Sequence, residues 1–93
     1  MTNTQTQLPL VWKPLWDAMR SSPAAWIPTT EEMYWDMLEA LPPLCMSKGA
    51  FLMSEADHTN ANNEEVYACF SRKSDAYFAR YMTKQEFVNE VAA

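Results

Sequence analysis

The chain has 93 residues, a formal net charge of −5 and a hydrophobic fraction of 48%, with four residues each of tryptophan, tyrosine and phenylalanine. This composition supplies the core of one small domain and argues against a disordered chain. The acidic balance disfavours a general nucleic-acid binder, because that affinity comes mainly from lysines and arginines that neutralise phosphates.

The first segment of the chain is polar and the second is helical. Residues 1–8 form a leader that we expect to be flexible, and residues 9–93 are expected to form a single α+β domain. A short helix is predicted over residues 10–20, with Pro14 in its first turn, where a missing amide costs nothing.

A central helix is predicted next, because both of its ends are marked. Thr29 and Glu32 have the spacing of a capping box, and Pro42 with Pro43 ends the helix. Between these marks, apolar residues recur at helical spacing. They are Met33, Tyr34, Met37, Leu38 and Leu41.

Three strands and a last helix are predicted in the second half. Apolar residues alternate with others in residues 50–55, 66–72 and 76–82. Gly49 is expected to supply the positive φ before the first strand, and residues 56–65 form the loosest loop. Residues 73–75 form a tight turn, and a second capping box between Thr83 and Glu86 opens the last helix.

The predicted order is therefore α-α-β-β-β-α. Because the connections are too short for parallel crossovers, we expect a three-stranded antiparallel meander with the helices packed on one face. The central apolar positions of these elements are expected to share one core. They are Met37, Leu38, Phe51, Phe70, Phe78 and Phe87.

Few residues indicate catalysis or a bound cofactor, and we expect neither. One glycine is too few for a P-loop or a dinucleotide-binding fingerprint. His58, Cys45 and Cys69 lack paired zinc-ligand spacing, and apolar surroundings predict that both thiols are buried and reduced. A small enzyme or a metal-binding protein that uses the loop of residues 55–65, or a Cys-His pair, stays open as an alternative. The polar candidates of that loop are Asp57, His58, Glu64 and Glu65.

Charge is polarised along the chain. Residues 29–65 carry eight acids and one base, whereas residues 66–84 carry four bases and one acid. The basic cluster is expected to solvate the second hairpin. The leader has no positive charge and no apolar run approaches the length of a membrane span, so we expect a cytoplasmic protein without a membrane partner.

The best candidate for a partner-binding site is the outer face of the central helix. Glu32, Asp36 and Glu39 project along one line with Trp35 at its margin, and residues 29–47 hold no lysine or arginine. Aromatic side chains beside a charged rim are typical of the energetic centres of interfaces. Solvation alone also explains a row of acids, and that alternative stays open. Glu55 and Asp57 complete the predicted site.

The run YWDMLEALPPLCMSKGAFLMSE, followed by VYACFSRKSDAYFARYMT, resembles a family of small domains of unknown function carried on bacterial plasmids and related mobile elements. The similarity covers roughly residues 30–83. The two aromatic strands are also similar to those of plasmid antirestriction proteins, although this chain lacks their glycine-rich turn and is shorter. The resemblance implies a setting among phage or plasmid accessory genes, and it supplies no catalytic residue.

These observations predict a small non-enzymatic protein-binding module from a mobile element. Its expected partner is a host or plasmid protein with a basic surface, and one version is an inhibitor of a nucleic-acid-handling defence system, of the anti-CRISPR or antirestriction type, that occupies a basic groove. No direct contact with nucleic acid is expected. The chain is expected to be a monomer or a weak homodimer, and a structural homodimer joined at an open sheet edge is the remaining alternative.

Overall fold

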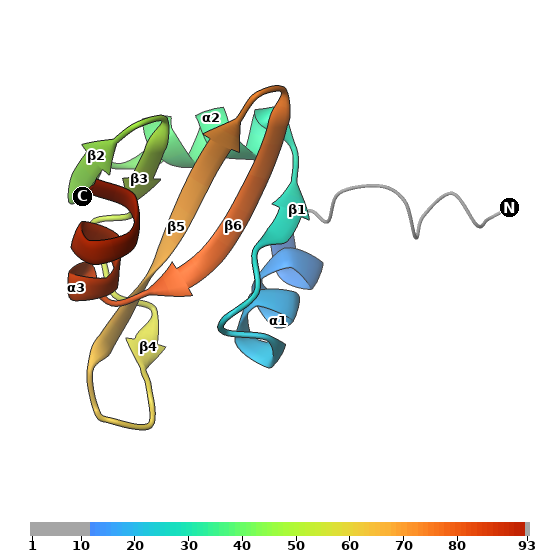
Figure 1. Ribbon diagram of the computed structural model, residues 1–93. Helices are drawn as coiled ribbons and strands as arrows, with labels where there is room; N and C mark the ends of the chain where they lie inside the picture. The colour runs from blue at the N-terminus through green and yellow to red at the C-terminus, as the bar shows by residue number, and fades with distance from the viewer. Residues whose placement is uncertain (1–11, 93) are drawn as a thin grey trace, which may run out of the picture.

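An antiparallel sheet forms the centre of the fold in the computed structural model, which describes residues 12–92 (Figure 1). The predicted leader lies outside these residues. The six strands run in the order β1-β6-β5-β3-β2, with β4 paired to β5 beside this path. Their bounds are β1 (Ile27–Thr29), β2 (Cys45–Ser47), β3 (Ala50–Leu52), β4 (His58–Thr59), β5 (Glu65–Lys73) and β6 (Ala76–Met82).

The helices cover both faces of the sheet. Helices α1 (Trp12–Ser21) and α2 (Glu31–Ala40) lie on one face. The short α3 (Lys84–Phe87) continues into a π-helical turn, η2 (Val88–Ala92), on the other face (Figure 1). The α+β class is confirmed, but the expected three-stranded meander with all helices on one face is wrong.

Two separate apolar clusters replace the single core that was expected. The first contains residues of α1 and α2 together with Phe51, Phe70 and Tyr81, and the second contains Leu52, Cys69, Met82 and Phe87. Because successive residues of a strand point to opposite faces, β5 contributes Phe70 to one cluster and Cys69 to the other. Phe70 and Phe87 are therefore on opposite sides of the sheet, and Phe78 is only half-buried.

Two edge strands escape the sequence pattern because each has three residues, too few for an alternation to show. Strand β1 contains Pro28, which an edge strand tolerates since one side of it makes no ladder hydrogen bonds. Strand β2 is joined to β3 by a turn in which Lys48 has φ 53° and Gly49 has φ 80°. The positive φ predicted for Gly49 is confirmed, and this pair of values is typical of a type I′ hairpin.

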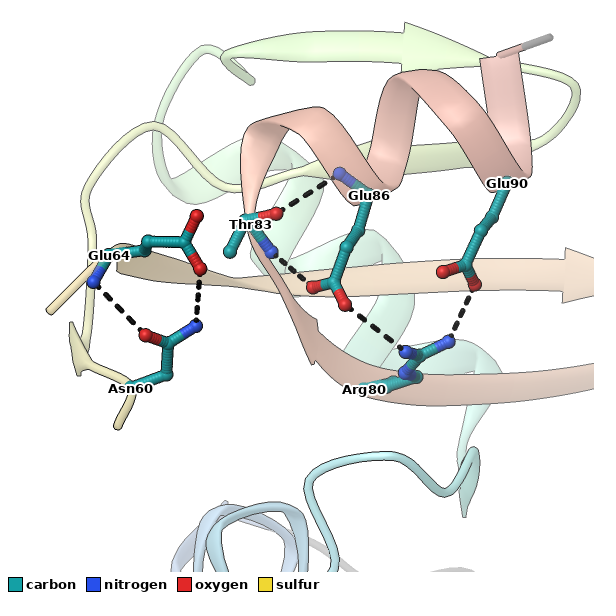
Figure 2. Close-up of polar contacts among 6 residues, drawn as sticks. All are labelled: Asn60, Glu64, Arg80, Thr83, Glu86 and Glu90. Carbon is teal, nitrogen blue, oxygen red and sulfur yellow. Dashed lines mark hydrogen bonds and ion pairs between the residues drawn. The ribbon is translucent and has the colours of Figure 1, made fainter. Parts of the chain in front are cut away.

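The N-cap predicted for α3 agrees with the structure, whereas the N-cap of α2 lies one residue after the predicted one. Thr30, not Thr29, caps α2, because its Oγ1 accepts a hydrogen bond of 3.0 Å from the amide of Met33. Thr29 is instead buried in β1. At α3 the predicted box is confirmed: Thr83 Oγ1 accepts from the Glu86 amide, and Glu86 Oε1 accepts from the Thr83 amide at 2.8 Å (Figure 2).

The segment expected to be a loose loop is an ordered hairpin. Strand β4 pairs with the start of β5, and Asn60 organises the turn between them. Its Oδ1 accepts from the amide of Asn62 at 2.9 Å. The same oxygen accepts from the amide of Glu64 at 3.0 Å, and Asn60 Nδ2 donates to Glu64 Oε1 (Figure 2). Short polar side chains here replace the backbone hydrogen bonds that a regular strand would make.

Candidate interaction surfaces

The outer side of α2 presents three carboxylates and an indole to solvent. Glu32, Trp35, Asp36 and Glu39 are all exposed, and we call them the acidic face. The opposite side of the helix buries Met33, Tyr34 and Met37 in the first cluster, which fixes the rotation of α2. The placement of these four predicted residues on one exposed face is confirmed.

Trp35 is held in place although it is 39% exposed. Its ring lies edge-on to Tyr34, with ring centroids 5.0 Å apart and planes at 85°. Tyr34 in turn donates a hydrogen bond of 2.8 Å from its hydroxyl to the carbonyl of Gly49. The indole therefore rests against a side chain that is itself anchored across the fold.

The charges of the acidic face are not neutralised within the described chain. The ion pairs formed among residues 12–92 use Asp17, Asp57, Glu86 and Glu90 as their acids, and none uses a carboxylate of the acidic face. Like charges at such helical spacings oppose helix formation by a few tenths of a kcal/mol per pair. A concentrated negative potential results, next to an apolar ring.

The other two predicted residues lie outside α2, in the connection between β3 and β4. Glu55 and Asp57 lie between β3 and β4, where they line a cavity of about 240 Å³ together with Trp16, Leu41 and Met53. Glu55 is exposed there. The cavity lies beyond the C-terminal end of α2, so a partner that covers the acidic face is not required to touch these two carboxylates.

Asp57 is occupied by contacts within the fold. Its Oδ2 accepts hydrogen bonds from the Arg20 guanidinium and from the Tyr81 hydroxyl, at 2.6 Å for the tyrosine, and lies 3.0 Å from His58 Nδ1. Trp16 stacks on the Tyr81 ring at 6.3 Å between centroids, and the His58 ring meets Tyr81 edge-on at 4.7 Å. Asp57 thus joins the β3–β4 connection to α1 and β6.

The pKa values of this cluster follow from the contacts. Burial raises the pKa of Asp57, but the hydrogen bonds from Tyr81 and His58 and the charge of Arg20 outweigh it, so the pKa lies below its ordinary value. Burial, with the hydrogen bond to Asp57, raises the pKa of Tyr81 to about 12. Sequence reasoning missed this cluster because Arg20, Asp57 and Tyr81 come from distant segments with no shared local pattern.

On the opposite face of the sheet, Arg80 connects the C-terminal helix to the sheet. Its Nη1 lies 2.9 Å from Glu90 Oε1 and its Nη2 3.9 Å from Glu86 Oε2 (Figure 2). The guanidinium also lies over the ring of Trp26, 5.7 Å from its centroid. The side chain is only 12% exposed, so this member of the basic cluster does not solvate the hairpin as expected.

The alternatives based on metal or thiol chemistry gain no geometric support. Among residues 12–92 no group of three histidine, cysteine or acidic side chains is arranged to hold a metal ion. Cys69 is buried and its pKa is raised by burial to about 12; Cys45 is half-buried, with a pKa that burial also raises. Both cysteines pack with the second cluster, whereas His58 contacts Tyr81 of the first, which separates the Cys-His pair by the sheet.

No helix among residues 12–92 is long and apolar enough to cross a bilayer. Comparison of the chain with protein-family models, curated proteins and solved structures finds no match.

Proposed function

We propose that this chain is a small non-enzymatic protein-binding module that acts through the acidic face of α2 in the cytoplasm. The observation that carries the proposal is the exposure of Glu32, Asp36 and Glu39 beside Trp35, which is 39% exposed, with no ion pair among residues 12–92 to neutralise these carboxylates. Charge of one sign steers association, and an exposed tryptophan supplies buried apolar area after contact.

The chemistry of the surface defines the partner. A protein with a clustered lysine and arginine surface matches the carboxylates in potential, and an apolar recess within it accommodates the indole. Grooves that bind nucleic acid have this combination of basic side chains and aromatic or apolar floor. A host or plasmid protein that handles nucleic acids is therefore the proposed class of partner, with occupation of its groove, and hence inhibition, as the proposed effect.

Solvation is the competing explanation of the acids, and the structure offers a way to separate the two. The exposure of Trp35 alone does not decide between them, because Trp12 and Trp26 are exposed to a similar or greater degree. If the face binds a partner, removal of the indole and reversal of the charges must both weaken the same complex. If it is only solvated, neither change affects any complex.

The test is affinity capture from lysate with four forms of the chain: the wild type, Trp35→Ala, Asp36→Lys/Glu39→Lys, and a matched control, Asp17→Lys/Asp75→Lys. The control changes net charge equally at two exposed acids outside α2. Among residues 12–92 it removes one ion pair, Lys13–Asp17, which is exposed and worth about 0–1 kcal/mol.

We expect the wild type and the control variant to capture a protein that neither of the two acidic-face variants captures. Calorimetry with that protein should show a loss of at least about 2 kcal/mol of binding for Trp35→Ala, on the scale of interface anchors. Equal capture by all four forms would contradict the proposed site.

A further inference from the structure

The two end strands of the sheet differ in their ability to accept another strand. Strands β1 and β2 end the path β1-β6-β5-β3-β2 and lie at opposite sides of the sheet (Figure 1). The central residue of β1 is Pro28, whose nitrogen carries no hydrogen to donate to a further strand. Strand β2 consists of Cys45, Met46 and Ser47, without proline or charge. Of the two, β2 is therefore the open edge.

The direction of the hydrogen bonds in β3 follows from its pairing with β5. The amide of Arg72 donates to the carbonyl of Gly49 at 3.0 Å, just before the first residue of β3. The amide of Met53 donates to the carbonyl of Ala68 at 2.9 Å, just after the last one. Hydrogen-bonded and non-hydrogen-bonded pairs alternate in an antiparallel ladder, so Phe51 at the centre of β3 directs its own N–H and C=O to β5.

Met46 consequently directs its backbone groups away from the sheet. It is the β2 residue opposite Phe51, whose N–H and C=O are directed to β5. The N–H and C=O of Met46 therefore point away from β3, to the outside of the sheet. Its side chain is 58% exposed. One residue thus offers a donor, an acceptor and an apolar side chain at the same place.

The open part of this edge is short. At one end the Leu44 amide donates to the Leu52 carbonyl at 2.9 Å, although Cys45 is the residue paired with Leu52. Two residues opposite one form a β-bulge, which interrupts regular pairing. At the other end the turn to β3 begins directly after Ser47. An added strand therefore finds regular hydrogen bonds at Met46 alone.

The surroundings of Met46 are apolar. Residues 40–47, ALPPLCMS, carry no charge. Leu41, the C-cap residue of α2, and Leu44 are both exposed. With Met46 they make three of the seven large apolar side chains that are exposed among residues 12–92, and all three lie between positions 41 and 46. Exposed apolar side chains that gather in this way are typical of protein interfaces.

We propose that β2 pairs with β2 of a second copy of this chain, antiparallel and with Met46 opposite Met46. The two copies then exchange two hydrogen bonds, because each Met46 donates its N–H to the C=O of the other. This two-fold contact uses both outward groups of each copy and closes on itself. A longer foreign strand would extend past the bulge and the turn, where β2 offers it no regular partners, so it gains no more hydrogen bonds than a second copy does.

The two-fold arrangement determines how the dimer responds to salt and concentration. Its axis is perpendicular to the joined sheets, so helix α2 of both copies lies on the same side. Each copy carries a net charge of −5, so the copies repel each other and added salt should strengthen the dimer. Binding of a basic partner to the acidic face should respond to salt in the opposite way. Because stable complexes bury about 800 Å² per partner and this edge is only three residues long, we expect half-association on the order of 0.1–1 mM.

Disulfide trapping tests the register. In the proposed pairing, Cys45 lies opposite Ser47 of the second copy in a non-hydrogen-bonded pair, with Cα atoms about 4.5 Å apart. A disulfide accepts this separation, so Ser47→Cys should give a covalent dimer through Cys45 on mild oxidation, seen on a non-reducing gel and by peptide mapping. The wild type and Cys45→Ser/Ser47→Cys each lack one of the two opposed thiols. They are the matched controls and should cross-link at least about tenfold less.

Met46→Pro, in the Ser47→Cys background, separates pairing from folding. Because the N–H of Met46 points outward, proline removes no hydrogen bond between β2 and β3 and gives β2 the feature that Pro28 gives β1. The melting temperature should be kept and the cross-linked fraction should fall at least about tenfold. Met46→Leu is the matched control and should cross-link fully. Met46→Lys leaves the backbone unchanged and places two like charges at the axis, so it should abolish cross-linking even if proline disturbs the strand.

Sedimentation of the wild type up to about 1 mM completes the test, and we expect its average mass to rise with concentration and with salt. A chain that stays monomeric would leave the edge to a foreign strand and overturn the proposal. Equal cross-linking of Ser47→Cys and Cys45→Ser/Ser47→Cys, or cross-linking unchanged by both Met46→Pro and Met46→Lys, would also overturn it. None of these readouts uses the captured partner, so failure of this proposal and failure of the acidic-face proposal are distinguishable.

Discussion

Replacement of Tyr81 by phenylalanine tests the cluster around Asp57. The change removes one hydroxyl from a ring that is 3% exposed and whose packing against Trp16 phenylalanine can preserve. Asp57 then loses a hydrogen bond of 2.6 Å. Hydrogen bonds to charged groups contribute about 1.5–3 kcal/mol, and Asp57 is partly exposed, so we expect a cost near the lower figure at neutral pH.

The contribution of Tyr81 to the free energy of unfolding should also depend on pH. Tyrosine titrates near pH 10 in an unfolded chain, and the pKa of Tyr81 is about 12 in the folded one. A pKa raised by folding gives stability that is complete below the unfolded value and is lost as pH rises through the folded value. With these two values, Tyr81 accounts for a loss of about 1.3 kcal/mol between about pH 9 and pH 11, which Tyr81→Phe should not show.

Urea unfolding of both forms across that pH range measures the difference, and absorbance of the phenolate reports the titration directly. Asp57→Asn provides a second route, because it removes the charged acceptor and should shrink the effect of Tyr81→Phe in a double-mutant cycle. If the wild type and Tyr81→Phe lose the same stability between about pH 9 and pH 11, the hydroxyl is not bonded as described.

Three further outcomes are expected. Phe70→Ala should cost about 3–5 kcal/mol in denaturant unfolding and Phe78→Ala much less, since Phe70 is fully buried and Phe78 is half-buried; equal costs would contradict the difference in burial between the two rings. Cys69 should resist iodoacetamide in the folded chain and react on unfolding, because burial raises its pKa to about 12; rapid alkylation under native conditions would show that the sheet opens. Met46 is 58% exposed on the edge strand β2, so any concentration-dependent dimer seen by sedimentation should dissociate in Met46→Lys at an unchanged melting temperature, and a dimer that persists would use another surface.

Much of the fold follows from local signals in the sequence. The proline stop after α2, the capping box of Thr83 and Glu86, the positive φ of Gly49 and the β5–β6 hairpin are each set by a few neighbouring residues, and each is confirmed. The class of fold follows from the order of such elements. The predictions that proved wrong depend on contacts between segments that are distant in the sequence.

The two faces of the sheet show why those contacts could not be predicted. Alternation in β5 assigns Phe70 and Cys69 to different sides, but it does not reveal that a C-terminal helix covers the second side. Thr29 and Thr30 both suit a helix cap, and the choice between them depends on the pairing of Thr29 with Tyr77 in the sheet. The acidic face was predictable because helical period alone exposes it, whereas the partners of Asp57 come from α1 and β6.

The most direct test of the acidic face is the ionic-strength dependence of the association rate with the captured partner. We expect the wild type to associate more slowly as salt rises, and Asp36→Lys/Glu39→Lys to associate slowly at low salt with little further change. The same steep salt dependence in both forms, at equal rates, would contradict the claim that α2 presents the binding surface.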